Sequence, residues 1–253
     1  MEAEFQNKVA LITGESMGIG QAIALAFARE NAKVVIAGIM TNGGEETVRM
    51  IRETGGDAYY INTDISQRIE IEEMILETIG IYDRIDYAFN NAEIGVNLAL
   101  TADISEEDWD HLMDINLRGV WLCMKYEIHH MLKQGGGVIV NMSSASGLYG
   151  TPYQCAYSAS THGILGLTKT TALEYAKSGI RVNAICPGQI HTFGAEEHFK
   201  RDPEAEARLN NTMPIGELGV LLEIAETVLW LCSDGASSIT GQFVAIDGWR
   251  SAV

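Results

Sequence analysis

Residues 13–20 read TGESMGIG, and this stretch decides the fold. It follows the apolar run Val9–Ile12 and leads into Ile19–Arg29, which has the apolar spacing of a helix. Glycines in the pattern G-x-x-x-G-x-G permit a tight turn and let backbone N–H groups approach a phosphate at the positive helix end. The stretch therefore predicts a strand–turn–helix unit shaped to hold a dinucleotide. Taken alone, it also fits a glycine-rich turn that binds nothing.

Apolar runs and helical segments alternate along the rest of the chain. The further runs are Val34–Ala37, Ala58–Ile61, Ile85–Phe89, Val138–Val140, Ile180–Ile185 and Phe243–Ile246. The segments with helical spacing are Ile19–Arg29, Glu45–Glu53, Ile69–Ile79, Glu106–Leu132, Ala156–Ala176 and Glu223–Leu231. This alternation predicts an α/β fold, a doubly wound, Rossmann-like parallel sheet of about seven strands with helices on both faces.

The whole chain is predicted to form a single domain. No repeat, low-complexity run or proline-rich linker interrupts residues 1–253, so one dinucleotide-binding domain accounts for the length. The irregular stretch lies at about 189–212, where acidic and basic residues alternate. Two interpretations stay open there, a solvated helix or a substrate lid over the carboxyl ends of the strands.

The composition and charge of this chain argue against several classes of binding partner. Its 17 Lys and Arg residues against 34 Asp and Glu residues give a formal net charge of −17, which repels nucleic acid and anionic membranes. The first apolar run is far too short to span a bilayer. The four cysteines lie far apart, the histidines have no partners at ligand spacing, and the first residues do not resemble a secretion signal. We expect a soluble, cytoplasmic protein without a metal site.

Polar and turn residues follow the later strands in a specific order. They are Asp64 and Ile65 after the third run, Asn90 and Ala92 after the fourth, Asn116, Ser144, Tyr157, and then Pro187, Gly188 and Thr192 after the sixth. Each alone is ordinary for a turn or helix. The full series in this order and spacing is specific.

In this series the sequence resembles the short-chain dehydrogenase/reductase family, from Lys8 to Gly248. The resemblance implies a nicotinamide cofactor across the strand ends. It implies that Asp64 and Ile65 lie near the adenine, Asn90 near its ribose and Thr192 at the carboxamide. The implied cofactor-binding positions are Gly14, Glu15, Ser16, Met17, Gly18, Ile19, Gly20, Asp64, Ile65, Asn90, Ala92, Pro187, Gly188 and Thr192.

The same resemblance implies the catalytic positions Asn116, Ser144, Tyr157 and Thr161. Tyr157 would transfer the proton, and Ser144, thirteen residues earlier, would hydrogen-bond the substrate oxygen. Asn116 would support a bound water. Thr161 stands where the family has the lysine of its Tyr-x-x-x-Lys pattern, because residues 157–161 read YSAST.

Loss of this lysine changes the expected chemistry. Residues i and i+4 share a helix face, so the ammonium normally lies beside the phenol and favours the phenolate. An unassisted tyrosine titrates near pH 10, so alcohol oxidation is expected to be slow at neutrality and to rise toward about pH 10. Neither His162 nor Lys169 is placed to replace the lysine. Thr161 either fills space on the helix face or forms a hydroxyl relay to water.

Further departures surround the expected cofactor. Glu15 and Glu93 stand where the family has small residues, and both add negative charge unless they turn outward or meet a ribose hydroxyl. The second strand ends in residues 37–39, Ala-Gly-Ile, which offer neither an acid for the 2′-hydroxyl of NAD nor a base for the 2′-phosphate of NADP. NAD is favoured because that basic residue is missing, and Glu15 is a candidate ribose acceptor.

Two functions from different classes fit this sequence. The first is an oxidoreductase in which NAD exchanges hydride with a small alcohol or carbonyl substrate, as the retained Ser144, Tyr157 and Asn116 indicate. The second is a non-catalytic relative that serves as a binding or oligomerisation module, as Glu93 and Thr161 indicate.

Resemblance to the family also implies a homotetramer. Its subunits would pair through the long helices predicted at Glu106–Leu132 and Ala156–Ala176, and the C-terminal segment would complete the assembly. Trp249 replaces a glycine near that end, so the subunit packing is expected to differ from that of the family.

Overall fold

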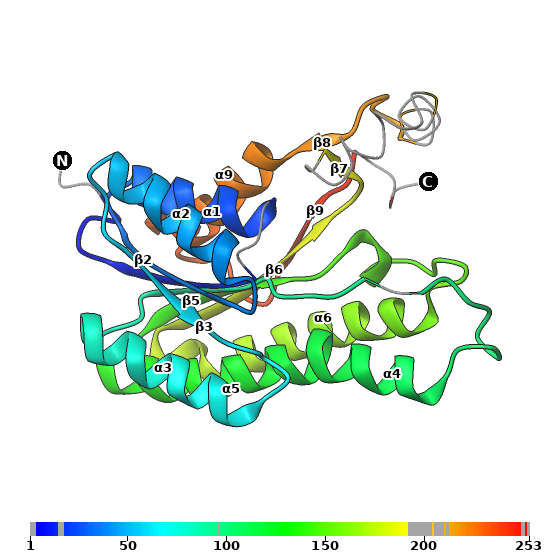
Figure 1. Ribbon diagram of the computed structural model, residues 1–253, viewed down its shortest axis with the longest axis horizontal. Coiled ribbons are helices and arrows are strands. Elements are labelled where there is room, and N and C mark those ends of the chain that lie inside the picture. The colour runs from blue at the N-terminus through cyan, green and yellow to red at the C-terminus, as the bar shows by residue number, and fades with distance from the viewer. Residues whose placement is uncertain are drawn as a thin grey trace.

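A computed structural model shows a parallel sheet between two layers of helices (Figure 1). It describes residues 4–14, 18–95, 97–191, 204, 210, 213–248 and 251. The strands of the main sheet are β1 Val9–Thr13, β2 Lys33–Gly38, β3 Ala58–Asn62, β4 Tyr87–Asn90, β5 Gly137–Met142, β6 Ile180–Pro187 and β9 Phe243–Ile246. Every pairing between them is parallel. The predicted doubly wound fold is confirmed.

The order of the strands indicates where a ligand would bind. The seven strands lie in the order β3-β2-β1-β4-β5-β6-β9, so the chain builds outward from β1 to β3 and then crosses to β4 on the other side. The order reverses between β1 and β4. In sheets of this kind, ligands bind outside the carboxyl ends of the strands at such a reversal.

Helices cover both faces of the sheet (Figure 1). On one face lie α1 Ile19–Arg29, α2 Thr41–Glu53 and α9 Leu221–Cys232. On the other lie α3 Arg68–Tyr82, α4 Glu106–Met113, α5 Val120–Gln134 and α6 Cys155–Tyr175. Short 3-10 turns follow at Ala145–Gly147, Ala176–Ser178 and Asp234–Ala236.

Burial on both faces explains why the strands are apolar throughout. All five residues of β1 are buried, with Ala10 and Ile12 in one core and Val9 and Leu11 in the other. Successive side chains of a strand point to opposite faces, so a strand between two helical layers needs apolar residues at every position.

The helix predicted over Glu106–Leu132 differs in the structure. It consists of α4, a π-helical segment at Asp114–Gly119, and α5. Asn116 lies in this segment, and Gly119 packs so closely that a Cβ would come within 2.9 Å of the carbonyl oxygen of Ile65. π-Helical turns inside α-helices frequently mark functional sites. Apolar spacing alone does not reveal them.

The apolar pattern of the sequence did not predict two short strands. β7 Ile190–His191 and β8 Gly219–Val220 form a separate two-stranded sheet. Two residues are too few to show a period-two pattern. Of the stretch predicted as a solvated helix or lid, residues 192–203, 205–209, 211 and 212 lie outside the described residues, as does Trp249.

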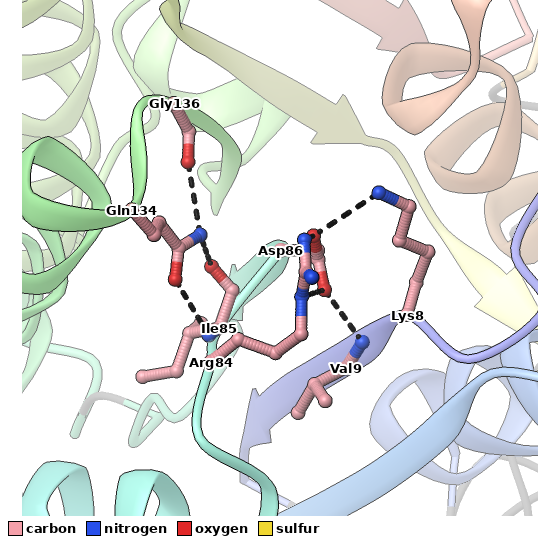
Figure 2. Close-up of polar contacts among 7 residues, drawn as sticks. All are labelled: Lys8, Val9, Arg84, Ile85, Asp86, Gln134 and Gly136. Carbon is pink, nitrogen blue, oxygen red and sulfur yellow. Dashed lines mark hydrogen bonds and ion pairs between the residues drawn. The ribbon is translucent and has the colours of Figure 1, made fainter.

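A polar cluster anchors the amino ends of β1 and β4, away from the site (Figure 2). Asp86 accepts hydrogen bonds from the Val9 N–H at 2.9 Å and from Arg84 Nε at 2.6 Å, and pairs with Lys8. The Gln134 side chain bonds both backbone groups of Ile85.

Within the described part of the chain, no helix has the length and apolar character needed to cross a bilayer.

Candidate active site

The glycine turn after β1 packs against the chain that follows β4. Gly14 has φ 75°, and a Cβ there would lie 2.6 Å from Cα of Ala92. A Cβ on Gly20 would overlap the carbonyl oxygen of Gly14. Asn91 Nδ2 donates to that same oxygen at 2.5 Å, and the Asn91 N–H donates to Thr13 Oγ1 at 3.1 Å. Close backbone approach therefore requires glycine at positions 14 and 20.

The N-terminus of α1 follows the glycine turn. Gly18 precedes the helix with φ 118°, a conformation suited to glycine. Among the described residues no side chain caps α1, and its first turn holds no acidic residue. The first N–H groups of a helix and the helix dipole suit the pyrophosphate of a dinucleotide. Glu15, Ser16 and Met17 lie outside the described residues.

Ser144 and Tyr157 meet beyond the carboxyl end of β5. Ser144 caps the 3-10 turn Ala145–Gly147, because its Oγ accepts the Ser146 N–H at 3.2 Å. Tyr157 lies in the first turn of α6 and forms a side-chain hydrogen bond with Ser144 that lowers the pKa of the phenol. The two residues predicted to act on the substrate oxygen are thus brought together.

Comparison with known proteins identifies this arrangement. Residues 14–248 match the family described as Enoyl-(Acyl carrier protein) reductase. An uncharacterized oxidoreductase of Thermotoga maritima is 41% identical over 252 residues, covering 98% of this chain and 99% of the relative. The chain belongs to the short-chain dehydrogenase/reductase family.

Solved structures of this family superpose closely. Levodione reductase gives a TM-score of 0.93 at 35% identity, covering 98% of this chain and 99% of that chain. A variant of actinorhodin polyketide ketoreductase with NADPH gives 0.92 at 34% identity, covering 97% and 98%. Relatives of this chain are oxidoreductases, and nicotinamide cofactors are those of the family.

The Thr161 hydroxyl of this short-chain dehydrogenase/reductase bonds its own helix. Thr161 is 1% exposed, and its hydroxyl donates to the Tyr157 carbonyl at 2.9 Å and to the Ser158 carbonyl at 3.2 Å. Both acceptors belong to its own helix, so the space-filling interpretation is the one that the geometry supports. His162 turns onto the Ser158 carbonyl, and the Lys169 ammonium lies over the Phe243 ring. Neither replaces the lysine.

Glu93 is the partner of Tyr157. The Tyr157 phenol donates to Glu93 Oε2 at 3.1 Å. Burial and the charge of Glu93 raise the pKa of Tyr157 well above its usual 10. Glu93 is exposed as a whole residue, but protein atoms crowd its carboxyl group, and this desolvation raises the pKa of the carboxyl to about 7, while the Tyr157 hydrogen bond lowers it. The sequence indicates Glu93 only as a negative charge beside the expected cofactor, because its contact with Tyr157 joins residues 64 positions apart.

Asn116 holds the chain next to Glu93. Its side chain is 1% exposed, Oδ1 accepts the Ile94 N–H at 2.9 Å, and Nδ2 donates to the Ile94 carbonyl at 2.9 Å. Both polar atoms of the amide therefore bind one backbone residue. Support of a catalytic water by Asn116 stays a prediction.

Asn90 belongs to a buried polar cluster. Its Nδ2 donates to Glu127 Oε2 and to Asn141 Oδ1, each at 3.1 Å, and Asn141 in turn donates to Thr168 at 3.0 Å. Glu127 Oε1 has no hydrogen-bond partner in the part of the chain that the structure describes, and burial raises the pKa of this carboxyl to about 8. No pattern in the sequence distinguished Glu127 from the polar residues around it on the helix.

The remaining predicted cofactor contacts stay predictions. Asp64 Oδ1 accepts the Ser66 N–H at 2.9 Å, and Ile65 is packed in the core. Gly188 meets the end of β9, where a Cβ would lie 2.7 Å from Cα of Asp247. Gly38 at the end of β2 accepts hydrogen bonds from the Tyr60 hydroxyl and the Thr63 N–H. Thr192 lies outside the described residues.

No group of three His, Cys, Asp or Glu residues in the described ranges is placed to hold a metal ion.

Proposed function

We propose that this chain is an oxidoreductase that moves a hydride between a nicotinamide cofactor and a small alcohol or carbonyl substrate. The observation that carries the proposal is the pairing of Ser144 with Tyr157 at the carboxyl end of the sheet. In this position the serine hydroxyl is a hydrogen-bond donor for a substrate oxygen. The phenol is the adjacent group that can gain or lose a proton.

The residues present fit the cofactor at its pyrophosphate. Gly14, Gly18 and Gly20 shape the turn, and the uncapped first turn of α1 offers N–H donors to the two phosphates. When bound, the nicotinamide supplies or accepts the hydride, and the protein side chains manage only the proton and the orientation of the substrate.

NAD is the cofactor we favour over NADP. β2 ends at Gly38, and Ile39 and Met40 follow it. Ile39 is 68% exposed, and none of the three residues is charged. A 2′-phosphate would find no cation there. Glu15 remains our candidate for the missing ribose acceptor on the grounds of its place in the glycine turn.

A non-catalytic role is the second candidate. The observation that favours it is the carboxylate of Glu93 beside the phenol of Tyr157, which disfavours the phenolate that relatives obtain with lysine. In that case the fold would serve as a binding or oligomerisation module. Exposed apolar side chains on α5 and α6, Trp121 and Leu173, support the homotetramer that either function would use. A cytoplasmic location stays a prediction.

Titration of the purified protein with NADH and NADPH, followed by nicotinamide fluorescence, separates the two functions. Micromolar binding of NADH supports the oxidoreductase and justifies a substrate screen of small alcohols and ketones. Absence of binding up to millimolar contradicts it. Restored binding in a Glu15→Gly, Glu93→Gly and Thr161→Lys variant would then show a scaffold that has lost its cofactor.

A further inference from the structure

We propose that Glu93 is the proton acceptor that replaces the family's lysine, taking the phenolic proton of Tyr157 as the substrate alcohol is oxidised. The inference rests on the proposed oxidoreductase function and deepens it. The geometry that carries it is the hydrogen bond from the Tyr157 hydroxyl to Glu93 Oε2 at 3.1 Å. Among the described residues, this carboxylate is the sole ionisable group bonded to that hydroxyl.

The chain holds Glu93 firmly from both sides. Before it, Asn91 Nδ2 bonds the Gly14 carbonyl and the Ala92 N–H donates to Thr13 Oγ1 at 3.3 Å. After it, Asn116 binds both backbone groups of Ile94. A carboxylate between two pinned residues loses little conformational freedom when it meets the phenol, so the contact is preorganised.

The proton moves in two linked transfers. During oxidation the substrate hydroxyl gives its proton to Tyr157 Oη, and the phenolic proton that Tyr157 already carries passes to Glu93 Oε2. An oxidised nicotinamide held at the turn of Gly14, Gly18 and Gly20 would accept the hydride, with both electrons of the substrate C–H bond, as the carbon–oxygen double bond forms. Glu93 ends as a carboxylic acid and returns its proton to water. Reduction runs the same transfers backwards.

This route removes the need for a free phenolate. A buried phenol beside a carboxylate holds its proton, so Tyr157 alone is a poor base at neutrality. A relay needs only that the final acceptor be ionised, and Glu93 with its pKa near 7 is about half ionised there. Thr161 offers no competing path, because its hydroxyl bonds its own helix.

Other ionisable groups near Glu93 leave this assignment intact. From α4, Asp108 and His111 line a cavity with Ile94 and Gly95. From α6, His162 bonds the Ser158 carbonyl. None of these three groups changes the pKa of Glu93. That pKa is raised by desolvation of the carboxyl and lowered by the hydrogen bond from Tyr157. The position of Glu15 lies outside the described residues, so its variant belongs in the test.

The pH dependence of kcat/KM for alcohol oxidation tests the relay. In the native protein the rate should rise through about pH 7 and then level off. Glu93→Gln keeps a hydrogen-bond acceptor for Tyr157 but takes no proton, so we expect about a 100-fold loss at neutrality and a rise only toward about pH 10. Glu93→Asp should keep the near-neutral rise. Glu107→Gln, a change at an exposed carboxylate of α4, should match the native protein.

Two outcomes overturn the relay. A Glu93→Gln variant with the native pH profile would show that the carboxylate only holds Tyr157 in place. Loss of the near-neutral rise in Glu15→Gln, with the rise intact in Glu93→Gln, would assign the proton to Glu15 instead.

Infrared titration of the cofactor-free protein separates this inference from the proposed function. A carboxylic acid C=O band should disappear as pH rises through about 7, be missing in Glu93→Gln, and shift in Tyr157→Phe; Glu127→Gln identifies the band of the second protonated carboxyl. A Glu93 band unmoved by Tyr157→Phe contradicts the shared proton. Failure of NADH to bind would instead contradict the function, whatever the infrared result.

Discussion

The Tyr157 phenol donates a hydrogen bond to Glu93 Oε2 at 3.1 Å, although the two residues are 64 positions apart in the chain. A lysine beside the phenol would lower its pKa, whereas this carboxylate and the burial of the ring raise it. In the relay that we propose, the negative charge of the pair lies on Glu93, and Tyr157 passes a proton on without becoming a phenolate. Oxidation by an unassisted Tyr157, rising only toward about pH 10, stays a prediction, and the relay through Glu93 is the alternative to it.

Thr161→Lys should move the oxidation profile to lower pH. An ammonium near Tyr157 and Glu93 favours the charged form of both acids, and a close opposite charge shifts such groups by about 1–3 pH units. We expect the midpoint near pH 7 to fall by about one unit or more. The measurement is kcat/KM against pH, with thermal unfolding alongside because position 161 is buried. An unmoved midpoint in a folded variant would show that the cation does not reach the pair.

Glu127→Gln should remove a pH-dependent loss of stability. Burial raises the pKa of Glu127 from 4.5 to about 8, so the folded protein keeps a proton that the unfolded chain has released between these values. The native state binds more protons than the unfolded state in this window, so its stability falls as pH rises through it.

The measurement for Glu127→Gln is urea unfolding at about pH 5 and about pH 8.5. Between these values we expect the variant to gain more than about 1 kcal/mol relative to the native protein. The comparison variant is Glu107→Gln, whose carboxylate is exposed. If both variants changed equally between the two pH values, the buried carboxyl would not be the cause.

Gly20→Ala and Gly80→Ala should change stability in opposite directions. A methyl at position 20 overlaps the Gly14 carbonyl, so we expect NADH binding to be lost and the free energy of unfolding to fall by about 1–3 kcal/mol. Gly80 lies inside α3 with open space around it, so alanine should stabilise the protein by about 0.5–1 kcal/mol. Urea unfolding measures both. Equal effects would contradict the close packing of the glycine turn.

Glu15→Ala should weaken NADH more than NADPH. If Glu15 accepts a hydrogen bond from the ribose 2′-hydroxyl, its loss removes a charge-assisted bond that contributes about 1.5–3 kcal/mol, or at least about a tenfold change in Kd. Fluorescence titration with the two cofactors measures the ratio. Unchanged NADH affinity would remove Glu15 as the ribose acceptor.

The sequence by itself determined the fold and the glycine turn, and its resemblance to the family implied the Ser144–Tyr157 pair. Strands buried on both faces must be apolar throughout, so β1 and β2 were visible as runs bounded by turn residues. Glycine at Gly14 follows from a local need for positive φ and close backbone approach. The apolar runs and the positive φ are local requirements that are visible within a few residues, whereas the close approach of Gly14 to Ala92 appears only in the folded chain.

Tertiary structure alone decided the partners of the carboxylates. Glu93 follows β4 and Tyr157 lies in the first turn of α6, which follows β5, and the two residues meet because β4 and β5 are neighbours in the sheet. Glu127 meets Asn90 across the packing of α5 on β4. The π-helical segment around Asn116 depends likewise on its bonds to Ile94. Such contacts form between segments distant in sequence, where neither residue's local pattern records the other, so only the folded chain reveals the proton acceptor.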